Sequence, residues 1–405
     1  MHKYKSKHVL GTTMSLLLVG CNLFPTYAMR VNEFENANID IDSVAVIDQQ
    51  SGDLLYSQNA DKVRNIASVT KCMTLLLTLE AVDRGDISLD DIVEINEIPN
   101  TWGSEFGFKK GDKFTVYELL EMAMIISAND ACVVLAGVVS GSVEQFVEDM
   151  NTKAAQLGLN DTKFFNPNGL PLGRSNNADG GNVSTARDIA YLVKFINDNY
   201  FSIVNKITSS KVLDLKGMDG ARNNTNKLLF RNDASKGYVV DGFKTGFTNQ
   251  AGYCLVTTSV HDNNTPDNKD DDFRTIGVSL GGVGYEHRFD EHSRMLKYIS
   301  DKYVKTKLIS KDEVIRTYNK YDNPKTEVKI VPQTDLNVLI YNGDTSMYKK
   351  TITVSDNIEY PIKKGDVLGK IEFINEKNPS MKYSVNLVSL SDVSDISFLE
   401  KLFKR

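Results

Sequence analysis

The feature that most constrains the fold is the run SVTKCMTLLLTLEAV, from Ser68 to Val82, which is apolar on every side of a helix. Such a helix must be enclosed by other elements, because it has no polar face to present to water. The run ends at the sequence DRG, where glycine is typical of a helix end. We therefore predict a central helix in a domain core, with Lys71 as the one cation inside the run.

The segments on either side of this helix predict the fold class. Residues 43–58 alternate between apolar and polar side chains around a Gln-Ser-Gly turn, which predicts a β-hairpin. Helical patterns follow from residue 115 to residue 198, and strand patterns return over residues 238–280. Strands at both ends with helices between them predict one α+β domain whose sheet is closed by both ends of the segment. The charged stretch Asp262–Asp272 is typical of a solvated hairpin loop, and its spacing matches no calcium loop.

A second, smaller domain is predicted downstream. After about Thr306 the helical period disappears, and alternating strands separated by Asn, Asp and Gly turns indicate a β-rich domain. We expect the first domain at residues 29–305 and the β-rich domain at residues 306–390. The last segment, residues 391–405, is either an amphipathic anchor on a membrane surface or a terminal helix packed on the β domain. Its apolar side chains would share one helical face: Ile396, Leu399, Leu402 and Phe403.

The N-terminus has the pattern of a secretory leader. Three lysines precede an apolar stretch that is too short to span a bilayer stably. We favour cleavage after Ala28, which makes residues 1–28 a signal peptide, and lipid attachment at Cys21 in the sequence LVGC is the alternative. Either route predicts an exported protein.

Composition and charge argue against several kinds of partner and cofactor. The formal net charge is -6 and no basic cluster lies outside the extreme N-terminus. Phosphate binding needs a concentrated basic face, so nucleic acid is not an expected partner. Beyond the leader only Cys72, Cys132 and Cys254 remain, an odd number that cannot close into a complete disulfide framework and that fits no zinc spacing. We expect three buried free thiols and neither a metal nor a cofactor.

Ser68 and Lys71 are spaced for acyl transfer. They are three positions apart, so on a helix their side chains lie on one face within reach of each other. A serine hydroxyl is a poor nucleophile until a base removes its proton, and a lysine can be that base when burial and a nearby cation lower its pKa. The apolar helix supplies the burial, and the backbone N–H groups at its start suit an oxyanion. Alone, Ser-x-x-Lys is weak evidence, because the pattern is common by chance.

Two further short motifs strengthen the hypothesis. SAN, Ser127–Asn129, lies at a break between two apolar helical stretches. KTG, Lys244–Gly246, lies on a predicted strand, where its glycine would let a substrate backbone approach closely. Taken singly, the first motif is explained by helix caps and the second by an exposed charge on an edge strand. The order Ser-x-x-Lys, Ser-x-Asn, Lys-Thr-Gly, each in the expected element, favours one shared catalytic site.

These motifs and the segments around them resemble the penicillin-binding serine D-alanyl-D-alanine carboxypeptidases of low molecular mass. Nearly the whole mature chain takes part, in the segments ASVTK, WGSEFGFKKGDKFTVYELLEMAMIISANDA, NPNGLP, STARDIA, NTNKLL, VDGFKTGFTNQAGYCLV and IKKGDVLGKIEF. The resemblance implies a penicillin-binding, serine β-lactamase-like α+β domain, with an antiparallel sheet and a helical subdomain, followed by a small all-β domain. It also implies peptidoglycan stem peptides as substrates, β-lactam antibiotics as inhibitors, and a location at the outer face of the bacterial cytoplasmic membrane or in the cell wall.

The resemblance further implies a role for each residue of the first two motifs. Ser68 would attack the carbonyl carbon between the two terminal D-alanines and form an acyl-enzyme. Lys71 would act as its general base, and Ser127 would relay a proton toward the leaving amine. Asn129 would hydrogen-bond the acyl side of the substrate.

The third motif and a downstream arginine would bind the other end of the substrate. Lys244 and Thr245 would face the terminal carboxylate, and Lys244 would also lower the pKa of the lysine base through like-charge repulsion. The oxyanion would lie between the backbone N–H groups of the nucleophile and of Phe247. Arg288, in GYEHRF, falls where the family commonly has an arginine that helps to bind the carboxylate, and a surface arginine at a helix start is the alternative.

Three other interpretations are open. A class A β-lactamase adds a glutamate that activates water to clear the acyl-enzyme, but NDTKFFNPNGLPLG has none, so we expect penicillin to stay attached as a slowly cleared adduct. An inactive cell-wall-binding module is the non-enzyme alternative, and the intact motifs argue against it. GVSLG matches the nucleophile elbow of α/β-hydrolases, with Asp290 and His292 downstream, but Ser279 lies within a strand pattern rather than at a strand-to-helix turn.

Overall fold

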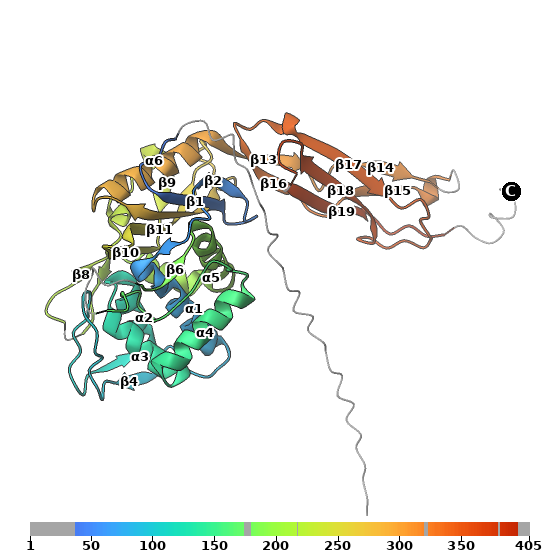
Figure 1. Ribbon diagram of the computed structural model, residues 1–405. Coiled ribbons are helices and arrows are strands. Elements are labelled where there is room, and N and C mark those ends of the chain that lie inside the picture. Colours follow the sequence, from blue (N-terminus) through green and yellow to red (C-terminus); the bar gives the residue numbers. More distant parts are fainter. Residues whose placement is uncertain (1–36, 174–179, 217, 320–322, 380, 396–405) are drawn as a thin grey trace, which may run out of the picture.

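The computed structural model describes residues 37–173, 180–216, 218–319, 323–379 and 381–395 (Figure 1). The expected signal peptide at residues 1–28, with its alternative processing sites Cys21 and Ala28, lies outside this part of the chain. The apolar residues of the expected terminal tail, which begin at Ile396, lie outside it as well.

An antiparallel sheet forms the centre of the first domain. Its strands are β1 (Ser43–Asp48), β2 (Leu54–Gln58), β9 (Tyr238–Val240), β10 (Lys244–Thr248), β11 (Gly252–His261) and β12 (Phe273–Gly282). The strand order is β10-β11-β12-β1-β2, and β9 pairs with β11. The pairing of β1 with β12 confirms that strands from both ends of the domain close the sheet. Residues 262–272 connect β11 to β12 and form the expected hairpin loop.

Helices cover both faces of this sheet (Figure 1). They are α1 (Lys71–Asp83), α2 (Val116–Ile125), α3 (Asn129–Ser140), α4 (Val143–Gln156), α5 (Ala186–Thr208) and α6 (His287–Lys302). On β1, Val44 and Val46 join the apolar core beneath α6, whereas Ala45 and Ile47 join the core shared with α1 to α5. This alternation places α6 and the other helices on opposite faces. Within the described ranges, no single helix is both long and apolar enough to cross a bilayer, and α3 and α4 meet that criterion only as a pair bent by 82°.

Helix α1 is enclosed as its composition requires, since ten of its thirteen residues are buried. Ser68 itself lies in a short 3-10 helix, η1 (Ala67–Thr70), and not in the first turn of the α-helix as the pattern predicts. The preceding Ala67 has a φ of 45°, so the chain enters through a tight left-handed turn and regular α-helix begins only at Lys71. The three cysteines of the described chain are buried and free, which confirms that expectation.

Three two-stranded sheets lie among the helices and loops. They pair β3 (Arg64–Asn65) with β6 (Val183–Ser184), β4 (Ile92–Glu94) with β5 (Lys113–Thr115), and β7 (Val212–Leu213) with β8 (Arg222–Asn223). The β3–β6 pair leads directly into η1, and β8 leads into the segment NTNKLL. Both pairs therefore help to place segments that border the site.

A separate β-rich lobe follows α6 and extends away from the first domain (Figure 1). Its strands are β13 (Tyr303–Ile309), β14 (Arg316–Tyr318), β15 (Val328–Pro332), β16 (Leu336–Tyr341), β17 (Tyr348–Val354), β18 (Val367–Asn375) and β19 (Lys382–Ser389). Five of them form a sheet in the order β14-β15-β19-β18-β17, and β13 pairs with β16. Since α6 runs directly into β13, the boundary expected between residues 305 and 306 falls inside a strand. Val393, within the segment expected as a tail, is buried in this lobe and pairs with Ile362.

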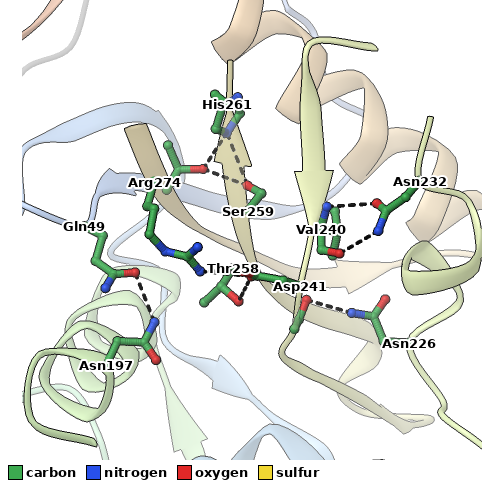
Figure 2. A network of polar contacts seen from close by, with 12 residues as sticks. Gln49, Asn197, Asn226, Asn232, Val240, Asp241, Thr258, Ser259, His261 and Arg274 are labelled. Carbon is green, nitrogen blue, oxygen red and sulfur yellow. Dashed lines mark hydrogen bonds and ion pairs between the residues drawn. The ribbon is translucent and has the colours of Figure 1, made fainter. Parts of the chain in front are cut away.

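A buried polar layer lies between the sheet and α6. His261 of β11 is fully buried, and its ring nitrogens lie 2.6 Å from Ser300 Oγ and 2.8 Å from Thr275 Oγ1. Figure 2 shows His261 in this layer and also the 2.8 Å ion pair between Arg274 of β12 and Asp241, which follows β9. Hydroxyl partners satisfy the ring without giving it a counter-charge, so the neutral imidazole is the favoured form.

The two buried histidines should make the fold sensitive to acid. Burial lowers the pKa of His261 and of His292 to about 3, whereas a histidine in the unfolded chain titrates near 6.5. The folded state therefore binds fewer protons, and the contribution of these rings to stability is complete above about pH 6.5. As the pH falls toward about 3, protonation of each ring should lower the free energy of unfolding by about 1.4 kcal/mol per pH unit. Urea unfolding at several pH values measures this slope. His261→Gln should reduce the slope by the contribution of one histidine ring. An identical slope in the variant contradicts the assignment.

Candidate active site

The candidate nucleophile lies at a tightly constrained turn. Ser68 follows Ala67, whose backbone is left-handed, and its hydroxyl lines a cavity. Gly169, with a φ of 88°, presses against this turn, because a β-carbon there would lie 1.9 Å from the carbonyl oxygen of Ala67. Only glycine fits at that position, and the close contact supports a turn that would otherwise be strained.

Three oxygen atoms surround the amine of Lys71. Its Nζ lies 2.9 Å from Ser68 Oγ, 2.7 Å from Asn129 Oδ1 and 2.7 Å from the carbonyl oxygen of Asn168. The amide nitrogen of Asn129 donates to the carbonyl oxygen of Trp102 at 2.7 Å, which directs Oδ1 toward the amine. The two carbonyl oxygens can only accept hydrogen bonds. A neutral amine therefore donates to both and keeps its lone pair for the Ser68 hydroxyl, as a general base must.

Burial lowers the pKa of the Lys71 amine toward neutral pH, where a general base is most effective. Lys71 is fully buried, and desolvation lowers its pKa to about 8, although the nearby Cys132 and Asp130 raise it by a smaller amount. Lys244 is also fully buried, and desolvation followed by repulsion from Lys71 lowers its pKa well below the usual value. Burial, rather than the expected like-charge repulsion from Lys244, therefore accounts for the lowered pKa of Lys71.

Ser127 lines the same cavity as the nucleophile. It occupies the short break between α2 and α3 with a φ of 65°, and only 5% of the residue is exposed. The left-handed backbone at this break ends α2 and allows α3 to begin at Asn129. The break therefore brings Ser127 and Asn129, two residues apart, to one side of the cavity.

Strand β10 forms a further wall. A β-carbon at Gly246 would lie 3.1 Å from the backbone nitrogen of Ser68, so glycine allows the strand to approach the nucleophile closely. Lys244 Nζ donates to the carbonyl oxygen of Thr245 at 3.1 Å. The ring of Phe247 is 41% exposed and stacks on Tyr253, with 4.3 Å between ring centroids.

Arg288 is buried against this strand, so it is not the free surface arginine of the alternative. Its Nη1 donates to the carbonyl oxygens of Gly246 at 3.1 Å and Cys254 at 3.3 Å, and its guanidinium lies 4.5 Å from the ring centroid of Phe289. Desolvation lowers its pKa from the usual value. Among the described residues no carboxylate pairs with Arg288, so its charge is available to an anionic ligand.

One cavity of about 290 Å³ unites the predicted site. Six of the eight predicted residues line it: Ser68, Ser127, Asn129, Thr245, Phe247 and Arg288. The other two, Lys71 and Lys244, are fully buried and lie behind this lining. Arg288 is the only charged residue among the described lining residues, so the cavity suits an anion. In the described part of the chain, no three His, Cys, Asp or Glu side chains come together in a way that could hold a metal ion.

Comparison with known proteins connects this geometry with a family. The sequence profile described as D-alanyl-D-alanine carboxypeptidase, peptidase S11, matches residues 30–266, which is more than half of the chain. The chain belongs to the D-alanyl-D-alanine carboxypeptidase family. A second profile, the C-terminal domain of penicillin-binding protein 5, matches residues 303–395.

Relatives of this D-alanyl-D-alanine carboxypeptidase cover both domains. It is 32% identical to the D-alanyl-D-alanine carboxypeptidase DacF of Bacillus subtilis, over 81% of this chain and 80% of the relative. The crystal structure of penicillin-binding protein 5 from Haemophilus influenzae is 30% identical, covers 88% of this chain and 98% of its own, and superposes with a TM-score of 0.68. Penicillin-binding protein D2 from Listeria monocytogenes, solved with ampicillin bound, is 29% identical over 65% of this chain and 98% of its own, with a TM-score of 0.55. These findings confirm the predicted fold class.

The sequence GVSLG, which contains Ser279, does not form a nucleophile elbow in this carboxypeptidase. Ser279 lies inside β12, is fully buried and has its Oγ 2.8 Å from His292 Nδ1. Asp290 does not complete a triad, since its carboxylate pairs with Arg231 at 2.9 Å on the surface. The α/β-hydrolase alternative is therefore wrong, because a hydroxyl enclosed in a continuous strand cannot reach a substrate.

Several residues of the site are not singled out by the sequence pattern. They are Trp102, Asn168, Gly169 and Thr225, of which the middle two lie in NPNGLP and the last in NTNKLL. Trp102 and Asn168 contribute backbone carbonyl oxygens, which no pattern of side chains reveals. The Asn-Gly pair at residues 168–169 is a signal in the sequence that could have pointed to this loop, because such pairs are typical of left-handed turns.

Acylation should depend on the protonation state of Lys71. As the expected base, Lys71 can accept the Ser68 proton only in its neutral form, and its pKa is about 8. The rate of acylation by a β-lactam should therefore rise about tenfold per pH unit below about pH 8 and level off above it. Single-turnover kinetics across this range measure the profile, and Lys71→Arg, which stays protonated, should lower the rate roughly a thousandfold. A rate that falls between about pH 6 and 8 contradicts the assignment of Lys71 as the base.

Gly246→Ala should slow acylation while the protein remains folded. The added methyl group would meet backbone atoms of Ile66 and Ser68 at 3.1 Å, so β10 must move away from the nucleophile. Such a displacement should lower the acylation rate roughly tenfold. The matched control is Gly137→Ala on α3, where an added methyl group meets nothing within 4 Å. Circular dichroism tests folding, and equal acylation rates for the two variants contradict the close approach.

Proposed function

We propose that this D-alanyl-D-alanine carboxypeptidase removes the terminal D-alanine from peptidoglycan stem pentapeptides through an acyl-enzyme on Ser68. The family membership supports the reaction class. The observation that carries the assignment to this site is the 2.9 Å contact between Lys71 Nζ and Ser68 Oγ, made by an amine whose other two partners are carbonyl oxygens. That arrangement activates the hydroxyl of Ser68.

Acylation then follows from the positions of the side chains and backbone N–H groups that line or adjoin the cavity. Lys71 takes the proton of Ser68 as Oγ attacks the carbonyl carbon of the penultimate D-alanine. The backbone N–H groups of Ser68 and Phe247 stabilise the oxyanion of the tetrahedral intermediate, which the close approach of β10 to the nucleophile supports. As the C–N bond breaks, Ser127 passes its proton to the leaving nitrogen and takes the proton held by Lys71, which leaves Lys71 neutral, and D-alanine departs with its carboxylate intact.

Substrate binding uses the charge and the hydrogen bonds of the cavity walls. Asn129 bonds the acyl part of the peptide, while Lys244, Thr245 and Arg288 attract the terminal carboxylate. The cationic character of the lining supports this orientation. The carboxylate is the feature that distinguishes the end of a stem peptide from an internal peptide bond.

Deacylation requires water and the same lysine. Lys71 accepts a proton from water as the oxygen attacks the ester carbon, and Ser68 is released with its hydroxyl restored. Among the described residues that line the cavity, none is a glutamate or aspartate that could activate water as in a class A β-lactamase. This supports a carboxypeptidase that a β-lactam acylates and leaves only slowly, in line with the ampicillin-bound Listeria relative.

We further propose that the protein acts at the outer face of the bacterial cytoplasmic membrane or in the cell wall. The leader pattern at residues 1–28 supports export, and the amphipathic pattern within residues 391–405 supports contact with a membrane surface. The net charge of -6 argues against nucleic acid as a partner. The reaction uses side chains and backbone groups of this chain, and we propose that it needs no cofactor.

Mass spectrometry should find one penicillin adduct, located on Ser68, and release of D-alanine from a peptide that ends in D-Ala-D-Ala. Ser68→Ala should abolish both signals, with a loss of roughly a thousandfold or more in turnover. Ser279→Ala is the control, and it should retain activity. Penicillin binding without release of D-alanine would favour an inactive wall-binding module, and rapid loss of the adduct would favour a β-lactamase.

A further inference from the structure

We infer that Thr225 is a positioning residue for recognition of the terminal carboxylate, acting through the hydroxyl of Thr245. The inference rests on the proposed function, because it concerns how the same cavity tells a carboxylate from an uncharged group. Thr225 belongs to the segment NTNKLL and reaches the cavity from outside the three motifs.

Thr225 joins two walls of the cavity. Its backbone N–H donates to the carbonyl oxygen of Ile125 at 3.0 Å, and its hydroxyl donates to the same oxygen at 3.4 Å. Ile125 is the last residue of α2, two residues before Ser127. On its other side, Thr225 Oγ1 accepts the hydroxyl of Thr245 on β10 at 2.8 Å. One side chain thus connects the end of α2 with the substrate-binding strand.

The neighbours of Thr225 hold it in place. The amide of Asn226 is fully buried and donates to the carbonyl oxygen of Gly242 at 2.9 Å, just before β10 (Figure 2). The amide of Asn224 donates to the carbonyl oxygen of Ser210 at 2.8 Å, and its Oδ1 accepts the backbone N–H of Asn226 at 2.8 Å. Since both flanking side chains are anchored, Thr225 cannot easily move away from Thr245.

The direction of the hydrogen bonds sets the state of Thr245 in the free enzyme. A carbonyl oxygen only accepts, so the Thr225 hydroxyl donates to Ile125 and presents its own oxygen to Thr245. Thr245 therefore donates its single proton to Thr225 and presents lone pairs to the cavity. Lone pairs repel a carboxylate, so this state must change when substrate binds.

A carboxylate can reverse this short chain without leaving a hydroxyl unpaired. Thr245 turns its proton to the carboxylate, and Thr225 turns its proton from the long 3.4 Å bond with Ile125 to the oxygen of Thr245, 2.8 Å away. The donated bond polarises the Thr245 hydroxyl and makes it a better donor to the anion. Since an uncharged end group induces this reversal less strongly, Thr225 should matter most for substrates that carry the carboxylate.

The test compares Thr225→Val and Thr225→Ser on two thioesters of one N-acyl-D-alanine. Thioglycolate is the leaving group of the first thioester and carries a carboxylate, while thioglycolamide is that of the second and is uncharged. Thr225→Val keeps the shape of the side chain and its backbone bond, and it should lower kcat/KM for the thioglycolate ester roughly fivefold to tenfold. The loss with the thioglycolamide ester should be less than about twofold, and Thr225→Ser should restore nearly the parent value with both.

Thr78→Val is the matched control, because Thr78 is a buried threonine whose hydroxyl donates to the carbonyl oxygen of Thr74 within α1. It should lower kcat/KM for both thioesters equally or for neither. Equal losses with both thioesters in Thr225→Val would show a purely structural role and overturn the inference, as would the absence of any loss. If the parent enzyme releases thiol from neither thioester, the proposed function itself fails, and that outcome is recognised without any variant.

Discussion

The buried amine of Lys71 is the interaction on which the rest of the site depends. An ammonium group in a dry interior is unfavourable unless a counter-charge or a lower pKa relieves it. The described structure relieves it by the second route, since the hydrogen-bond partners of the amine are a hydroxyl and two carbonyl oxygens. The apolar helix α1, the break before α3 and the loop around Gly169 all serve to build this environment, and Ser68 is activated because it is one of the three partners.

The cavity is formed where the helical part of the domain meets the edge of the sheet. Two glycines make the meeting possible, because Gly169 accommodates the turn before the nucleophile and Gly246 allows β10 to approach its backbone nitrogen. Thr225 then connects the end of α2 to β10. Arg288 within the lining gives the cavity a positive potential, so one arrangement of walls activates the serine and orients an anionic peptide end.

The sequence supports much of this picture, and it does so unevenly. The three motifs predict Ser68, Lys71, Ser127, Asn129 and Lys244, because each depends on a side chain in a recognisable position along a helix or strand. Side-chain patterns do not identify backbone groups, so only the structure shows that the carbonyl oxygens of Trp102 and Asn168 belong to the site. The pattern GVSLG shows the opposite failure, since a correct spacing of residues says nothing about whether Ser279 is accessible.

By itself, the sequence determined the α+β class, the central helix, the closing of the sheet by its first and last strands and the motif residues. Those properties follow from the period of apolar side chains and from local spacing, which the chain carries at every position. Only the tertiary structure decided that Ser68 stands in a 3-10 turn, that Arg288 is buried against β10 and that Thr225 contacts Thr245. Each of these depends on contacts between segments that are distant in the sequence, such as Gly169 with Ala67, Arg288 with Gly246 and Thr225 with Thr245, and no local pattern contains that information.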